Sequence, residues 1–205
     1  MKKIFLLLAL SLSVFAFTSC SDDDDDKTSP AVVTSGYIDA TAKNTWNYYS
    51  LKNNKLVGSA ADTEEETAAW AARKDWDFAV NRYSIRTNSG AATTVGAKGG
   101  VFTCPETVKF ASLTTMPKDV TFEVDEKITS EGMQGTVTTV KSKATVILFK
   151  KNADGSLMMP PVYLKAPVYI MRTADGKSNY KLEFTQYKDE NGKSGNVKFN
   201  FAELK

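Results

Sequence analysis

The sequence contains no histidine, and this absence removes several kinds of site at once. Nucleophilic catalysis by a serine or cysteine of the usual kind needs a histidine as its general base. The common zinc sites combine histidine with cysteine, and histidine is the commonest metal ligand in proteins. We therefore expect neither a triad hydrolase nor a zinc enzyme, and any metal ligand has to come from another side chain.

Cysteine and excess charge are also scarce. The chain has two cysteines, Cys20 and Cys104, and a formal net charge of +2 that disappears if Lys2 and Lys3 are removed with the N-terminal segment. Cys20 is a candidate for lipid attachment, so no intramolecular disulfide is expected and stability has to come from a hydrophobic core. No basic stripe with interleaved aromatic residues is present, which argues against nucleic acid as a partner.

The one long apolar run lies at the N-terminus. Two lysines precede an apolar stretch over residues 4–17, and small residues lead to Cys20. This pattern is typical of a secretory signal peptide, and the run is too short to be a good membrane-spanning helix. The segment FTSC resembles the lipobox of bacterial lipoproteins, in which cleavage precedes a cysteine that is then acylated. We predict a signal peptide over residues 1–19 and lipid attachment at Cys20.

The segment SDDDDDK follows directly. Five adjacent carboxylates repel one another and cannot pack, so residues 20–30 are predicted to form a solvated, lipidated tether. A calcium loop would need ligands at alternate positions and a turn glycine, and neither is present. Acidic residues behind a lipidated cysteine also resemble the surface-export signal of some Gram-negative lipoproteins. We expect an outer-membrane lipoprotein displayed on the cell surface, with release from the cell as a further outcome.

The rest of the chain has a hydrophobic period of two residues. The segments YKLEFTQY and NVKFNF each place apolar residues on one face of a strand, and Asn191-Gly192 between them is a strong hairpin signal. Two shorter runs, ATVILF over residues 144–149 and VYLKAPVYIM over residues 162–171, end at NADG and TADGK turns, and Pro167 marks an edge or a bulge. Residues 31–205 are therefore predicted to form a single mostly-β, antiparallel domain.

One helix is predicted to interrupt these strands, in the segment ADTEEETAAWAARK over residues 61–74. Asp62 is the expected N-cap with Glu65 three residues later, and Arg73 and Lys74 would end the helix. Trp70 would fasten the helix to the sheet. The fold class is thus mostly β with one or two short helices.

Three further patterns have a structural and a functional interpretation. The glycine-rich segment over residues 90–100 lacks the spacing of a phosphate-binding loop, so we expect a flexible loop. Four carboxylates could meet as a catalytic pair, although solvated strand residues explain them equally well: Asp75, Asp77, Glu123 and Asp125. Aromatic residues on predicted strands either fill a core or form a wall for a flat ligand such as a sugar or a porphyrin: Trp46, Tyr48, Tyr49, Trp76, Phe78 and Tyr83.

An ordered set of segments resembles the HmuY family of haem-binding surface lipoproteins. The similarity runs from about Tyr37 to Phe201, through the segments TWNYYSL, DWDFAVNRYSIRTNSG, KGGVF and VYLKAPVYIMRTADGKSNYKLEFTQYKDENG. No single motif is diagnostic, whereas the ordered set, with the lipobox and the total length, is fairly specific. Membership would imply a mostly-β, right-hand-shaped fold that grips haem b (iron protoporphyrin IX) between two strand-loop fingers. It would also imply a haemophore, a carrier with no catalytic step, that captures haem from host haemoproteins and passes it to a TonB-dependent outer-membrane receptor.

The axial ligands cannot follow the family's best-known member, which binds the iron through two histidines. Some relatives use methionine pairs, and a thioether is an established axial ligand to haem iron. Of the six methionines, Met1 leaves with the signal peptide, Met171 is expected in the core and Met116 in a local apolar contact. The resemblance places the others, Met133 in a hairpin tip and Met158-Met159 between a turn and two prolines, near the family's ligating positions. We predict Met133 and one of Met158 and Met159 as ligands.

Two lysines, Lys98 and Lys165, are the expected partners of the haem propionates. Two alternatives to the haemophore remain at this point. One is a surface adhesion or fimbria-associated β-lipoprotein with no haem site. The other is a glycan-binding module that uses Trp46, Trp70 and Trp76.

Overall fold

The computed structural model of the protein describes residues 31–132 and 135–205. The predicted signal peptide, the whole predicted tether with Cys20, and Met133 lie outside these residues. No helix in the described part is long and apolar enough to span a membrane.

The described residues form a mostly-β structure with antiparallel strands, as the period-two pattern predicts. The elements in chain order are β1 Thr34–Asp39, β2 Thr45–Ser50, β3 Lys55–Ala61, α1 Glu64–Ala71, β4 Phe78–Asn81, β5 Ser84–Thr87, α2 Gly90–Thr93, β6 Gly100–Thr103, the 3₁₀ helix η1 Phe110–Ser112, β7 Glu126–Gly132, β8 Gly135–Lys141, β9 Ile147–Phe149, β10 Tyr163–Lys165, β11 Tyr169–Arg172, β12 Asn179–Lys188 and β13 Ser194–Leu204.

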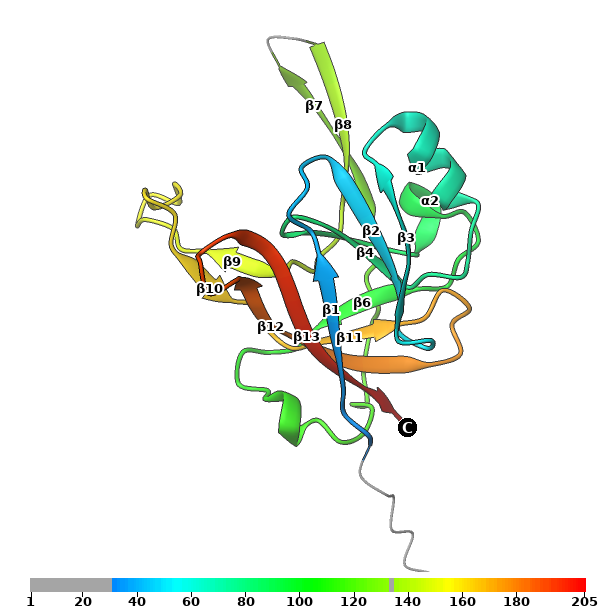
Figure 1. The fold of residues 1–205 in the computed structure, drawn as a ribbon. Helices are drawn as coiled ribbons and strands as arrows, with labels where there is room; N and C mark the ends of the chain where they lie inside the picture. The colour runs from blue at the N-terminus through cyan, green and yellow to red at the C-terminus, as the bar shows by residue number, and fades with distance from the viewer. Residues whose placement is uncertain (1–30, 133–134) are drawn as a thin grey trace, which may run out of the picture.

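Two larger sheets form the body (Figure 1). One has the strand order β1-β13-β12-β11-β6 and the other the order β3-β2-β4-β5. The main core lies between them, and the inward residues of β12 and β13 are the ones that the alternation predicts: Tyr180, Leu182, Phe184, Val197, Phe199 and Phe201. The predicted Asn191-Gly192 turn joins these two strands, with Gly192 at a φ of +78°. Met171 is also part of this core, as expected.

Each sheet has a second buried face, because further segments cover it. Helix α1 covers the four-stranded sheet, where Trp70 stacks on Tyr48 with ring centroids 3.8 Å apart. The predicted role of Trp70 is thereby confirmed. The segment that contains η1 covers the five-stranded sheet, where Phe110, Cys104 and Leu204 are buried together and Met116 packs beside them.

The predicted helix boundaries are wrong at both ends. Thr63, not Asp62, is the N-cap, because Thr63 is extended and its hydroxyl accepts from the Glu66 amide at 3.3 Å. Asp62 pairs instead with Arg86. The helix ends at Ala71, and the Arg73 guanidinium lies over the Trp70 ring rather than within the last turn. The glycine-rich segment also holds more structure than expected, since it contains α2 and leads into β6.

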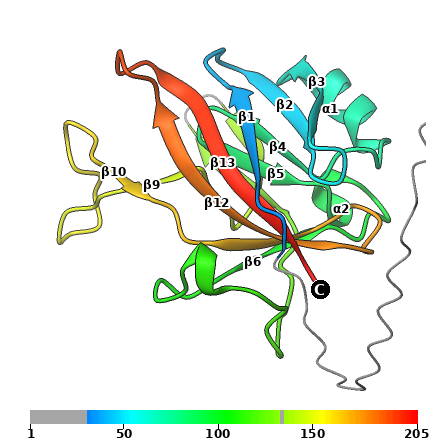
Figure 2. The ribbon, with the colours of Figure 1, turned by 60° about the horizontal axis from the view of Figure 1, so that its bottom comes forward.

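Two hairpins project from the body. Strands β7 and β8 pair with each other along their whole length and form the long upper projection in Figure 1. Strands β9 and β10 form a shorter projection with the loop over residues 150–162 at its end (Figures 1 and 2). The run ATVILF is a strand only from Ile147 onward, and Ala144 and Val146 before it are buried in the main core together with Ile147.

Candidate functional site

The loop over residues 150–162 is an ordered extension of the β9–β10 hairpin. The Lys150 amide donates to the Val162 carbonyl at 2.9 Å, and the Met158 amide donates to the Lys150 carbonyl at 3.1 Å. At the far end, Asp154 accepts hydrogen bonds from the amide and the hydroxyl of Ser156 at 2.9 and 2.6 Å, which confirms the predicted turn. The backbone beneath the two methionines is therefore fixed by hydrogen bonds on both sides of the loop.

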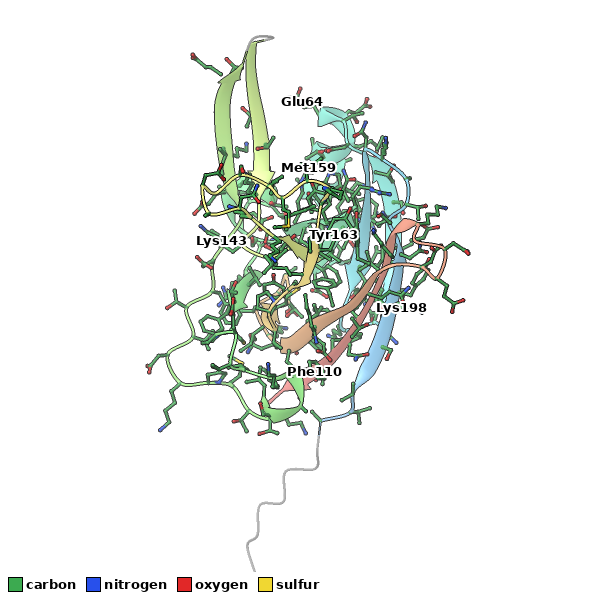
Figure 3. The ribbon with its side chains drawn as sticks, turned by 90° about the vertical axis from the view of Figure 1, so that its left-hand side faces the viewer. Glu64, Phe110, Lys143, Met159, Tyr163 and Lys198 are labelled. Carbon is green, nitrogen blue, oxygen red and sulfur yellow. The ribbon has the colours of Figure 1, made fainter. Side chains whose placement is uncertain are left out.

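The two methionines of this loop differ in exposure. Met158 is half-buried, whereas the Met159 side chain is 75% exposed, the third-largest exposed fraction among the large apolar residues described. Figure 3 shows Met159 above Tyr163, on the side of the molecule where the β7–β8 hairpin rises. Because the backbone is already ordered, only the side-chain entropy of Met159 would be lost when its exposed thioether binds a ligand. The other predicted ligand, Met133, lies outside the described residues, between β7 and β8.

A cluster of four aromatic rings lies below the loop. Phe149 and Tyr163 face each other across the β9–β10 ladder, with Tyr83 4.9 Å from Phe149 and Tyr187 5.7 Å from Tyr163 between ring centroids. All of these contacts are edge-to-face. Tyr83 is 40% exposed, so the cluster is open to solvent on one side. The Lys188 ammonium lies 4.6 Å from the Tyr163 ring centroid and adds a cation to this aromatic surface.

Sequence reasoning named only Tyr83 of this cluster. Tyr163 alternates with Leu164, and Phe149 with Leu148, so the period-two pattern shows that two faces exist. Strand pairing decides which face turns toward the core, and that information is not local. Burial in the core raises the pKa of the Tyr187 hydroxyl, so this residue stays neutral at physiological pH.

The opposite face of the β9–β10 hairpin borders a groove. Leu148 and Leu164, which are paired in the ladder, are 37% and 44% exposed there. The groove has a volume of 570 Å³ and runs to the η1 segment, with these lining residues: Glu106, Val108, Lys109, Phe110, Ala111, Leu148, Leu164, Lys165, Ala166, Pro167, Val168 and Glu183.

The structure separates the two lysines predicted as propionate partners. Lys165 lies at the end of β10, and its ammonium pairs with the Glu183 carboxylate at 2.7 Å. The Lys98 amide donates to the Ala174 carbonyl, in the turn that follows β11. Because Lys165 precedes β11 and Ala174 follows it, the two lysines lie beyond opposite ends of this strand. Lys165 belongs to the same hairpin as the methionine pair, and Lys98 does not.

The four candidate carboxylates do not form a catalytic pair. Asp77 accepts hydrogen bonds from the amides of Leu51 and Ala174, and Asp125 accepts from the amide and hydroxyl of Thr87. Burial raises the pKa of both carboxyl groups. In the part of the chain that is described, no group of three or more acidic or cysteine side chains could hold a metal ion. The buried aspartates are thus structural.

Most of the predicted aromatic wall is core. Five of its six members are buried: Trp46, Tyr48, Tyr49, Trp76 and Phe78. Trp46, Trp70 and Trp76 are at most 8% exposed, so none offers a surface on which a sugar ring could stack. The three tryptophans proposed for the glycan-binding alternative are therefore not available to bind a sugar.

Comparison with known proteins identifies the family. A family model described as HmuY protein matches residues 42–201. The chain belongs to the HmuY family. This is a family of binding proteins associated with haem. No curated protein matches the chain.

Three solved structures resemble this HmuY-family protein. A protein from Bacteroides vulgatus, provisionally described as an HmuY-like heme binding protein, has a TM-score of 0.60 and 23% identity, covering 83% of this chain and 91% of that one. The apo HmuY analog of Tannerella forsythia has a TM-score of 0.55 and 23% identity, covering 88% and 100%. Apo PinO from Porphyromonas gingivitis has a TM-score of 0.56 and 18% identity, covering 85% and 98%. At these identities the likeness establishes the shared fold, and the predicted HmuY-like fold is confirmed.

Proposed function

We propose that the protein is a cell-surface haem-binding lipoprotein, a haemophore that carries haem b and has no catalytic step. Membership of the HmuY family supports haem as the ligand. The observation that carries the proposal further is Met159, whose thioether is 75% exposed on a loop that is ordered by backbone hydrogen bonds. The sulfur of such a side chain is accessible to a metal-containing ligand, whereas a methionine in the core is not.

The proposed site uses two methionine ligands, one from each projecting hairpin. Met158 or Met159 would supply one sulfur, and Met133, which follows the last residue of β7, would supply the other. The four-ring cluster beneath the loop offers edges and a half-exposed surface of the kind on which a porphyrin packs. Lys188, whose ammonium lies over the Tyr163 ring, is one proposed partner of the propionates. Lys165, on the same hairpin, is the other and would have to release the Glu183 carboxylate with which it pairs in the opposite groove.

The ligand chemistry sets the properties of the carried haem. Thioether sulfur is neutral and soft, so it favours ferrous over ferric iron and raises the reduction potential. We therefore expect tighter binding of reduced haem than of oxidised haem. The carrier would take haem from host haemoproteins and deliver it to a TonB-dependent outer-membrane receptor. Anchorage through Cys20 would keep it at the cell surface, in line with the relative from Bacteroides fragilis that is provisionally described as a lipoprotein.

A haem titration of residues 27–205, followed by visible absorption, tests the proposal. It is performed both in air and with dithionite on the wild type, Met133→Ala and the double variant Met158→Ala/Met159→Ala. Met116→Leu is the matched control, because Met116 packs near the η1 segment, away from both hairpins. We expect saturation at one haem per chain with a low-spin ferrous spectrum, lost in the first two variants and kept in the control.

A wild-type titration indistinguishable from that of an unrelated protein would reject the haemophore. Self-association, or capture of a partner protein without a haem spectrum, would then favour the surface adhesion protein. Haem binding that is unchanged in both methionine variants would support the haem-carrier function but reject the methionines as axial ligands.

A further inference from the structure

The β7–β8 hairpin is a two-stranded sheet by itself, and it contacts the body where β7 meets α2 and β8 meets β5. Among the side chains described on its strands, Val140 is half-buried and the others are exposed. Figure 1 shows the two strands rising beyond the rest of the molecule. A two-stranded hairpin with no further partner is marginally stable in water. Its direction relative to the body therefore depends on the residues where it joins the body.

The β8 end joins the body through ordinary packing. Ala144 and Val146 are buried in the main core, and the Val146 amide donates to the Tyr83 carbonyl at 3.0 Å. The Thr145 amide donates to the Tyr169 hydroxyl at 3.1 Å. This end is a continuous strand-like connection into the sheet, and it fixes one point of the hairpin.

The β7 end joins the body through backbone pairing of Glu123 with Val101, two residues before Asp125, and then through the Asp125 carboxylate. Asp125 directly precedes β7 and is 3% exposed. Its Oδ2 accepts hydrogen bonds from the Thr87 amide and the Thr93 hydroxyl, both at 2.8 Å, and its Oδ1 accepts from the Thr87 hydroxyl at 2.6 Å. Its amide donates to the Ser89 hydroxyl at 3.0 Å, and the hydroxyls of Ser89 and Thr87 are 2.7 Å apart.

This network is directional because its acceptor and its donors belong to different parts of the molecule. The carboxylate precedes the hairpin, whereas the donors lie at the end of β5 and in α2. No ion pair to Asp125 occurs among the described residues, so hydrogen bonds rather than a countercharge compensate the burial of the carboxylate. A displacement of the hairpin root by about 1 Å would lengthen the bonds beyond useful distances.

We infer that Asp125 is a positioning residue that fixes the direction of the β7–β8 hairpin. The hairpin carries one of the two proposed ligating positions, so its direction sets the separation between the ligands. This second step rests on the proposed function, whereas the first step does not. Metal sites and ligand sites need their groups held within about 0.5 Å, and loss of a group that orients a ligand typically costs about 10–100-fold in metal affinity, so a loosened hairpin is expected to weaken haem binding about tenfold.

A distance measurement tests the positioning role without haem. Spin labels are attached to Glu131→Cys on β7 and Lys198→Cys on β13, both exposed, in a Cys104→Ala background, and pulsed electron paramagnetic resonance gives their distance distribution. The test variant is Asp125→Asn. The matched control is Asp77→Asn, which changes another buried aspartate that accepts two backbone amides but has no link to the hairpin.

We expect the width of the distribution to at least double in Asp125→Asn and to stay unchanged in Asp77→Asn. If Asp125→Asn fails to fold, Thr93→Val removes a single hydrogen bond of the same network and is expected to broaden the distribution less. Distributions that are equal in Asp125→Asn and in the wild type, or equally broadened in Asp77→Asn, would overturn the inference. Broadening that occurs only in variants of the Asp125 network supports the positioning role of Asp125, whether or not the wild type binds haem. Absence of haem binding would reject the proposed function and leave the positioning role standing.

Discussion

Phe149 and Tyr163 lie directly opposite each other in the β9–β10 ladder, with ring centroids 5.4 Å apart and ring planes at 83°. This edge-to-face pair joins the projecting hairpin to the main core, since both rings pack against buried core residues. The residues that continue the same hairpin, Lys150 and Val162, hold the backbone of the methionine loop. Packing at the base of the hairpin and order at its tip are therefore linked.

Replacing Tyr163 tests that link. Tyr163→Ala removes a partly buried ring and is expected to lower the free energy of unfolding by about 1–3 kcal/mol. Tyr163→Phe keeps the ring contacts with Phe149 and Tyr187 and is expected to be close to neutral. Urea denaturation followed by tryptophan fluorescence measures both. Equal losses in the two variants would assign the effect to the hydroxyl and contradict the role of the ring.

The pH dependence of haem binding distinguishes methionine from histidine ligands. A thioether has no proton to gain between pH 5 and pH 8, whereas a histidine ligand becomes protonated near pH 6–7 and leaves the iron. The absorption spectrum of the reduced complex is expected to stay constant from about pH 5.5 to about pH 8. Loss of the low-spin bands with a midpoint near pH 6.5 would point to a titrating ligand.

The lysines proposed as propionate partners can be distinguished by substitution. Lys165→Gln and Lys188→Gln are each expected to raise the haem Kd about two- to fivefold at low salt, as is usual for an exposed ion pair. The effect should shrink as salt is added. Lys98→Gln is the control, because Lys98 lies beyond the other end of β11. The haem Kd of this variant is expected to equal that of the wild type. An increase in the haem Kd of Lys98→Gln as large as that of Lys165→Gln would support the prediction from the sequence, in which both lysines pair with the propionates.

The buried carboxyl group of Asp77 is expected to shape the pH dependence of stability. Burial is the main cause that raises the pKa of Asp77 above 3.8, and the amides of Ala174 and Leu51 oppose it. A raised pKa in the folded state means that the contribution is fully present below about pH 3.8 and is lost as the pH rises through the folded pKa. A tenfold change in proton affinity corresponds to about 1.4 kcal/mol.

The difference between the wild type and Asp77→Asn isolates this contribution. Urea denaturation at pH 4, 5, 6 and 7 is expected to show that Asp77→Asn costs more stability at pH 4 than at pH 7. The comparison cancels the opposite contributions of Asp75 and Asp175, whose pKa values are lowered by hydrogen bonds in both proteins. A difference that is constant with pH would show that Asp77 does not titrate on unfolding.

The reactivity of the Cys104 thiol can be used to monitor unfolding. It is 3% exposed, and burial raises the pKa of its thiol, so the reactive thiolate is disfavoured in the folded protein. In the chain from residue 27 onward it is the one thiol. A thiol reagent at pH 8 is expected to react slowly in buffer and at the rate of a free thiol in 6 M urea, with the urea midpoint of stability as a cross-check. Rapid labelling in buffer would contradict the burial.

The sequence by itself determined the fold class, the long strands and the hairpin at Asn191-Gly192. These features depend on the alternation of side chains along a strand and on the turn preference of glycine, which are local properties. It also excluded histidine as a ligand, which is why the proposed ligands to haem iron are methionines. The order of the family segments added the expected fold.

Only the tertiary structure decided which faces and ends come together. Lys98 and Lys165 look equivalent in the sequence, but β11 separates them in space. Most of the aromatic residues predicted to form a ligand-binding wall are buried, because a helix and a second sheet cover both faces of the four-stranded sheet. The alternation of residues along a strand does not show which faces are covered. Asp125 looked like a solvated strand residue, and its role arises from Thr87 and Thr93, which reach it from more than 30 residues away. Long-range pairing of this kind is set by packing, not by local preference.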